Sequence, residues 1–211
     1  MKLVKDTWFP DSDKHMASEY LNGRCQFDTQ DLALTFCTKT RTVINGGAHV
    51  GLWARRYAEV FDTVLAFEPC TDTYDCLVEN VCSCMNVEPI CKGLGAEKGL
   101  AGIAQDVKWE GNTGGNYLVR GGTDCIITTV DSLDLYDLDL ISYDVEGFEL
   151  QALQGAEKTI QRCSPVIVCE EKSRLMQRQG NSSDSVRKYL GTLGYVRAAQ
   201  SRHDFVYVRS V

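Results

Sequence analysis

Long apolar runs are missing from this sequence of 211 residues, although hydrophobic residues make up 44% of it. No run approaches the roughly 20 residues that a membrane-spanning helix needs. The first ten residues also lack the apolar stretch that is typical of a secretion signal. We therefore expect a cytoplasmic protein with no membrane partner, and the length favours a single domain.

Positive charge is scarce as well. The chain holds 22 lysines and arginines against 29 acidic residues, and its formal net charge is −7. Arg55 and Arg56 form a pair, but no basic run stands out in the sequence. An acidic chain is repelled by phosphate backbones, so the composition disfavours a nucleic-acid partner.

Cysteine is the exception, with ten residues. Because no secretion signal accompanies them, we expect reduced thiols rather than disulfides. Five of them gather between Cys70 and Cys91, but Cys82 and Cys84 are separated by one residue, where zinc sites usually have two to four. The cysteines therefore predict small buried side chains and no zinc site.

The stretch from Thr42 to Pro69 is the most informative part of the chain. It is predicted to form a buried strand, a turn with Gly46, Gly47 and Gly51, a helix and a second strand that is closed by Glu68. Glycines let the backbone approach a ligand closely, and an acid about 20 residues beyond the turn accepts hydrogen bonds from a ribose. The pattern predicts a pocket for a nucleotide-type cofactor.

Strands alternate with helices along most of the chain, which predicts an α/β fold with a largely parallel sheet. The last two strands, Tyr195 to Ala199 and Phe205 to Arg209, are joined by a turn that is too short for a parallel crossover, so they must be antiparallel. The glycine-rich stretch from Leu100 to Ile127 predicts an inserted β-hairpin. We expect residues 1–40 to form an extension and a helix that pack on a core domain of residues 41–211.

Three segments of the chain resemble the FkbM family of S-adenosylmethionine-dependent methyltransferases. They are Val43 to Gly51, Phe67 to Pro69, and Asp139 to Glu149, which continues into Leu153 to Ala156. The similarity extends roughly from Thr42 to Glu171. It implies a Rossmann-like class I methyltransferase with a mostly parallel seven-stranded sheet, an antiparallel C-terminal strand and S-adenosylmethionine as cofactor.

The resemblance also implies which residues bind the cofactor. These are Asn45, Gly46, Gly47, Ala48, His49, Gly51, Glu68, Pro69 and Asp144. The family usually has aspartate where this chain has Asn45, and the change removes a charge near the methionine end of the cofactor. An asparagine can still accept a hydrogen bond there, so we expect the cofactor to bind.

Catalytic candidates follow the strand that ends at Tyr143. Methyl transfer is an in-line displacement, so the enzyme must align an acceptor oxygen and remove its proton. Asp144 and Glu146 lie where ligands bind in open α/β sheets, and His49 is a third candidate base. We assign no metal. Two alternatives stay open: Asp144 could cap a helix, or the two acids could hold Mg²⁺ together with Glu170.

The acceptor is expected to contact Thr113, Asn116 and Glu170. Asparagine and threonine beside aromatic residues (Trp8, Trp109 and Tyr117) suit a polyhydroxylated ligand. With the family resemblance, this leads us to expect O-methylation of a sugar, glycan or related small molecule, by a chain that could form a homodimer. The alternatives are a methyltransferase fold that binds ligands without turnover and, third, a nucleic-acid methyltransferase.

Overall fold

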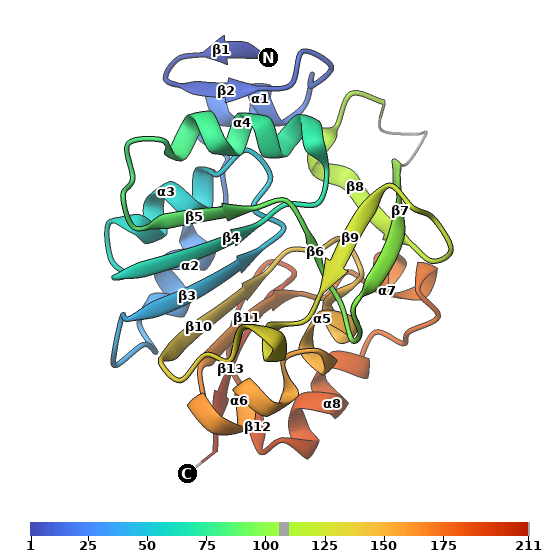
Figure 1. Cartoon of the computed structure of the whole chain (residues 1–211). Helices are drawn as coiled ribbons and strands as arrows, with labels where there is room; N and C mark the ends of the chain where they lie inside the picture. Colours follow the sequence, from blue (N-terminus) through green and yellow to red (C-terminus); the bar gives the residue numbers. More distant parts are fainter. Residues whose placement is uncertain (106–109, 211) are drawn as a thin grey trace.

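A seven-stranded sheet forms the centre of the computed structural model, which describes residues 1–105 and 110–210 (Figure 1). Its strands are β3 (Thr42–Gly46), β4 (Thr63–Phe67), β5 (Val87–Ile90), β10 (Leu138–Tyr143), β11 (Val166–Glu170), β12 (Tyr195–Ser201) and β13 (Asp204–Arg209), in the order β12-β13-β11-β10-β3-β4-β5. Neighbours from β11 to β5 are parallel, and β13 is antiparallel to both of its neighbours. The predicted sheet and its antiparallel C-terminal strand are confirmed.

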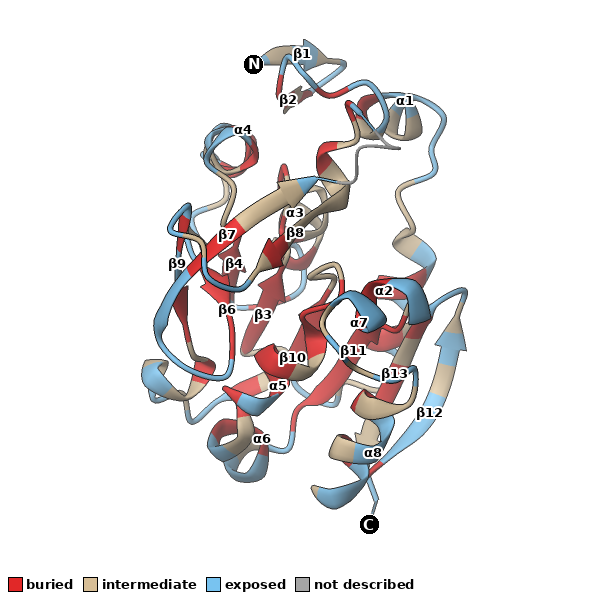
Figure 2. Cartoon of the chain, turned by 90° about the vertical axis from the view of Figure 1, so that its right-hand side faces the viewer, coloured by how far each residue is buried: buried red, intermediate tan, exposed pale blue. Residues whose placement is uncertain are grey.

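Helices cover both faces of this sheet, because successive residues of a strand point to opposite faces. They are α2 (Phe27–Leu34), α3 (Leu52–Ala58), α4 (Thr71–Val81), α5 (Glu149–Gln154), α6 (Glu157–Cys163), α7 (Ser173–Arg178) and α8 (Ser185–Thr192). Val43 belongs to the core cluster with α2, α3 and α4, whereas Ile44 belongs to the cluster with α5, α6 and α8. The central strands are accordingly buried (Figure 2). No described helix combines the length and apolar character needed to cross a bilayer.

The predicted hairpin insert is confirmed and extends into a second, smaller sheet. Its strands are β6 (Gly93–Leu94), β7 (Gly99–Gln105), β8 (Asn116–Val119) and β9 (Cys125–Thr128), in the order β6-β9-β7-β8. β7 pairs antiparallel with β8 and with β9. A short 3₁₀ turn, η2 (Thr113–Gly115), precedes β8, and a second one, η3 (Val130–Leu133), leads into β10.

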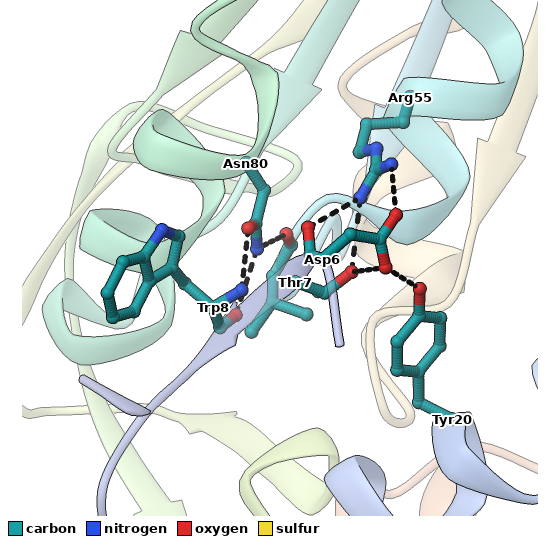
Figure 3. Close-up of polar contacts among 7 residues, drawn as sticks. Asp6, Thr7, Trp8, Tyr20, Arg55 and Asn80 are labelled. Carbon is teal, nitrogen blue, oxygen red and sulfur yellow. Dashed lines mark hydrogen bonds and ion pairs between the residues drawn. The ribbon is translucent and has the colours of Figure 1, made fainter. Parts of the chain in front are cut away.

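The N-terminal residues pack on the helices of the core. They form a hairpin of β1 (Lys2–Val4) and β2 (Thr7–Phe9), followed by α1 (Met16–Leu21). The Asn80 side chain exchanges two hydrogen bonds of 2.7 and 2.9 Å with the Trp8 backbone, and Arg55 pairs with Asp6 at 3.0 Å (Figure 3). Phe9 is fully buried, and the Trp8 ring packs against its cluster. Trp8 therefore serves packing of this segment.

Candidate active site

The glycine turn brings the end of β3 against the end of β10. Gly47 has a φ of +76°, and a Cβ atom there would lie 1.8 Å from the carbonyl oxygen of Asp144. Only glycine fits both the backbone conformation and the close approach. The turn is held to β4, since the N–H groups of Gly47 and Ala48 donate to the Phe67 carbonyl at 3.0 and 2.9 Å.

Glu68 follows β4 and is held in place by three donors. Its Oε2 accepts a 2.8 Å hydrogen bond from the His49 N–H, and its Oε1 accepts from the Cys70 N–H at 3.0 Å and from the Thr73 hydroxyl at 2.8 Å. Burial raises the pKa of this carboxyl, and the three hydrogen bonds oppose that rise. The side chain is thus fixed in position beside the glycine turn.

Glu68 lines a hollow between the main sheet and the insert, which we call the cofactor hollow. Its cavity volume is about 50 Å³. Its residues are Gly47, His49, Phe67, Glu68, Pro69, Cys70, Lys92, Gly93, Leu94, Ile103, Thr113, Gly114, Asn116, Tyr117, Leu118, Asp144, Val145 and Glu146. Pro69 and Asn116 were both expected at the site and both lie here, and the Asn116 amide also donates to Cys70 Sγ at 3.6 Å.

A second hollow, the turn hollow, shares Gly47, His49 and Asp144 with the cofactor hollow. It is lined by Met16, Arg24, Cys25, Gln26, Asn45, Gly47, Ala48, His49, Leu52, Trp53 and Asp144. The side-chain oxygen of Asn45 is buried and has no hydrogen-bond partner among the described residues. An orphan acceptor of this kind suits an ammonium donor. The glycine turn, Glu68 and Asn45 together fit a cofactor that carries both a ribose and an amino acid, as S-adenosylmethionine does.

Gly46 and Gly51 are not among the residues that line these two hollows, and their contact with the cofactor stays a prediction. A Cβ atom at Gly46 would lie 2.8 Å from the ring of Tyr143, and one at Gly51 would lie 2.6 Å from the Leu77 side chain. Gly51 also has a φ of +88° just before α3. Both glycines are needed for packing and chain direction.

His49 is part of a chain of hydrogen bonds that sequence reasoning missed. Its Nε2 lies 2.8 Å from the Thr113 hydroxyl, which donates a 2.5 Å hydrogen bond to the fully buried Asp13. Because the single hydroxyl proton is given to Asp13, Nε2 must carry the imidazole proton. Burial lowers the pKa of His49 to about 4, so the ring is neutral near pH 7. This bonding disfavours Nε2 as the base and gives Thr113 a structural role at the wall of the cofactor hollow.

Three acids converge where β10 and β11 end. Asp144 and Glu146 follow β10, and Glu170 ends the parallel neighbour β11. One carboxylate oxygen from each lies within 4.8 Å of the others. Burial raises the pKa of Glu146 to about 8 and that of Glu170 to about 10, and the nearby charge of Asp144 is the second cause of both increases. Lys172 contacts the Glu170 Oε1 at 2.5 Å.

A third hollow, the basic hollow, opens beside these acids. It is lined by His15, Asn112, Gly115, Glu146, Lys172, Arg174, Leu175 and Arg178. Glu146 lines both this hollow and the cofactor hollow. Tyr117 lines the cofactor hollow with the Arg178 guanidinium 4.5 Å from the centre of its ring. Trp109, which was expected to lie beside the acceptor, is outside the described residues.

Sequence reasoning also missed Lys172. The signal was a lysine that directly follows the two acids at the end of a strand, Glu170 and Glu171. Asp13 offered no comparable signal, because its partner Thr113 is 100 residues away.

No curated protein sequence matches this chain significantly. Among solved structures, an FkbM methyltransferase from Methylobacillus flagellatus KT is similar with a TM-score of 0.52 and 15% identity over 80% of this chain, which spans 43% of that protein. The Streptococcus mutans protein SMU.1697c, whose structure contains S-adenosylhomocysteine, is similar with a TM-score of 0.52 and 11% identity, and the match covers 86% of this chain and 94% of that protein. An rRNA methylase from Streptococcus thermophilus has a TM-score of 0.52 and 12% identity, and the match covers 86% of this chain and 94% of that protein.

These similarities confirm the class I methyltransferase fold. At the level of sequence, the family described as the methyltransferase FkbM domain matches residues 45–197, which is well over half of the chain. The chain therefore belongs to the FkbM methyltransferase family.

Proposed function

We propose that this protein binds S-adenosylmethionine and methylates a hydroxyl oxygen of a small polyhydroxylated acceptor such as a sugar. The observation that carries the proposal is the position of Glu146, which lines both the cofactor hollow and the basic hollow. A carboxylate shared by two hollows can meet a donor on one side and an acceptor on the other.

The cofactor would be held by residues around the glycine turn. Glu68 Oε1 already accepts two hydrogen bonds, but Oε2 accepts one and would accept another from a ribose hydroxyl. The buried oxygen of Asn45 would accept from the ammonium group of the methionine part. When bound, S-adenosylmethionine supplies a methyl group on a positively charged sulfur, which is an electrophile ready for displacement.

Glu146 would act on the acceptor. In its ionised form, which its pKa of about 8 favours at mildly alkaline pH, the carboxylate accepts a hydrogen bond from an alcohol, orients its oxygen and takes the proton as the new bond forms. Asn112 and Tyr117 lie at the same junction of the insert and the core, where amide and aromatic groups suit the faces and hydroxyls of a sugar ring. His49 is less suited, because burial lowers its pKa to about 4 and makes the ring a weak base.

A binding protein without turnover is the competing function, and Asn45 motivates it because the family usually has an aspartate there. An acceptor in nucleic acid is disfavoured by the net charge of −7. The two functions differ in the fate of the methyl group: only an enzyme converts the bound cofactor to S-adenosylhomocysteine.

The test is a methyl-transfer assay with S-adenosylmethionine labelled in its methyl group, a panel of monosaccharides and nucleotide sugars, and RNA as a separate arm. We expect label on a sugar as a base-stable ether. Glu146→Gln is expected to lower kcat about 100-fold with little change in cofactor affinity, because it removes a general base.

Glu97→Gln is the control, since Glu97 is exposed and lies outside the cofactor and basic hollows. Tight cofactor binding without transfer to any sugar would favour the binding module. Transfer to RNA alone would contradict the proposed acceptor class, and unchanged kcat in Glu146→Gln would contradict the assigned base.

A further inference from the structure

The acids at the ends of β10 and β11 carry more negative charge than their surroundings compensate. Asp144, Glu146 and Glu170 each place one oxygen within 4.8 Å of the others. Among the described residues, Lys172 is the cation bonded to this group, through Glu170 Oε1 at 2.5 Å. Counted as ionised, the three carboxyls outnumber this one ammonium, and the charge of Arg178 also acts on Glu146.

Two oxygens of the group are also left without hydrogen bonds. Glu170 is only 3% exposed, and its Oε2 has no partner among the described residues. The same holds for Oδ1 of Asp144. Burying an unpaired carboxylate oxygen is costly, so an arrangement with two such atoms beside a third acid indicates a missing positively charged ligand.

We propose that Asp144, Glu146 and Glu170 bind a divalent cation, Mg²⁺ or Mn²⁺. Three carboxylate oxygens are the hard ligands that these ions prefer, and neither a thiol nor an imidazole belongs to the group. The remaining coordination positions would face the basic hollow, which Glu146 and Lys172 line. This assigns a metal where the sequence analysis assigned none and kept Mg²⁺ as an alternative.

The chemical role of the ion rests on the proposed function. An acceptor hydroxyl in the basic hollow would reach the ion beside Glu146, and a bound cation lowers the pKa of a hydroxyl that coordinates it. The second oxygen of Glu146 would still take the proton. The ion would also let the acids remain ionised without mutual repulsion.

The test is a titration of the full chain, freed of metal by EDTA, with Mn²⁺ followed by electron paramagnetic resonance. We expect one saturable Mn²⁺ per chain, which Mg²⁺ displaces. Glu170→Gln is expected to weaken the affinity at least tenfold. Glu88→Gln, an exposed strand glutamate on β5, is the matched control and is expected to bind like the wild type.

Lys172→Gln supplies a second variant should Glu170→Gln fail to fold, as judged by circular dichroism. It is expected to bind Mn²⁺ more tightly, because its ammonium competes for Glu170. No saturable Mn²⁺ in the wild type would overturn the inference and leave Lys172 and protons as the compensating charges. Wild-type affinity in Glu170→Gln, or weaker binding in Lys172→Gln, would overturn it too.

Calorimetric titration with S-adenosylmethionine on the same preparation separates this inference from the proposed function. Cofactor binding without a Mn²⁺ site would overturn the cation inference alone. A Mn²⁺ site that is lost in Glu170→Gln, in a protein that does not bind the cofactor, would support the cation site and contradict the proposed function.

Discussion

Glu68 and the group of Asp144, Glu146 and Glu170 lie at the same edge of one sheet, but they differ in how many hydrogen bonds they accept. Glu68, after β4, accepts three hydrogen bonds from His49, Cys70 and Thr73. The acids after β10 and β11 share one ammonium and keep two buried oxygens without partners. The first group is complete without a ligand, and the second is not.

The two arrangements suit different ligands. A carboxylate that is already held by backbone donors is rigid and presents its remaining lone pairs to neutral hydroxyls, which suits the ribose of a cofactor. A group of acids with excess charge and few donors instead favours a proton or a cation. On the proposed function, cofactor recognition would lie at the end of β4 and the chemistry at the ends of β10 and β11, with β3 between them.

Glu171 shows that burial alone does not explain the unpartnered oxygens. It directly follows Glu170 and is 6% exposed, yet it accepts hydrogen bonds from the Tyr207 hydroxyl and from Arg197 at 2.6 Å. The two adjacent glutamates are almost equally buried, and only Glu170 lies in the group near Asp144. Glu149 is a further buried glutamate with an unpartnered oxygen, so what distinguishes Glu170 is that its unpartnered oxygen lies in a group with two other acids.

The largest effect is expected where the two groups meet, at Gly47. In Gly47→Ala the new Cβ atom would lie 1.8 Å from the Asp144 carbonyl oxygen, so we expect the free energy of unfolding to fall by more than about 3 kcal/mol. Gly23→Ala is the control, since Gly23 has a φ of +69° with nothing within 4 Å of its Cβ position. It should lose about 1 kcal/mol from backbone strain alone. Equal losses in urea denaturation would show that the close approach is unimportant.

An intermediate effect is expected from the pair of adjacent glutamates. Glu171→Gln removes the charge that Arg197 and Tyr207 hold, and it should lower the free energy of unfolding by about 3 kcal/mol. Burial raises the pKa of Glu170 to about 10, so Glu170→Gln removes little charge near pH 7 and should change stability by less than about 1 kcal/mol, or raise it, when divalent cations are absent. Thermal unfolding in EDTA would measure both. A larger loss in Glu170→Gln would mean that its carboxylate is stabilising without a ligand.

The smallest effect is expected at Glu68 and concerns binding. Glu68→Ala should weaken S-adenosylmethionine binding at least tenfold, or about 1.4 kcal/mol, with the fold intact. Isothermal titration calorimetry would measure it, with NAD as a control ligand and the exposed Glu88→Ala as a control variant. Unchanged affinity in Glu68→Ala would contradict the proposal that Glu68 recognises the ribose.

The sequence by itself determined the order of elements and the ligand-bearing edge. Strand periodicity, the glycines around Gly47 and the acid at Glu68 are local features, so they are readable from neighbouring residues. The short turn before Phe205 forced an antiparallel pair, because a parallel crossover needs more chain. Asp144 and Glu146 were located by the same logic, as residues that follow a buried strand.

Only the tertiary structure decided which of these residues have partners. Asp13 reaches Thr113 across 100 residues of chain, and that contact decides the protonation of His49. The tertiary structure also packs Gly46 and Gly51 closely against other side chains, and it leaves Glu170 Oε2 without a hydrogen-bond donor among the described residues. The physical reason is that burial and hydrogen-bond satisfaction depend on side chains brought together by packing, and their distance in sequence carries no record of their distance in space.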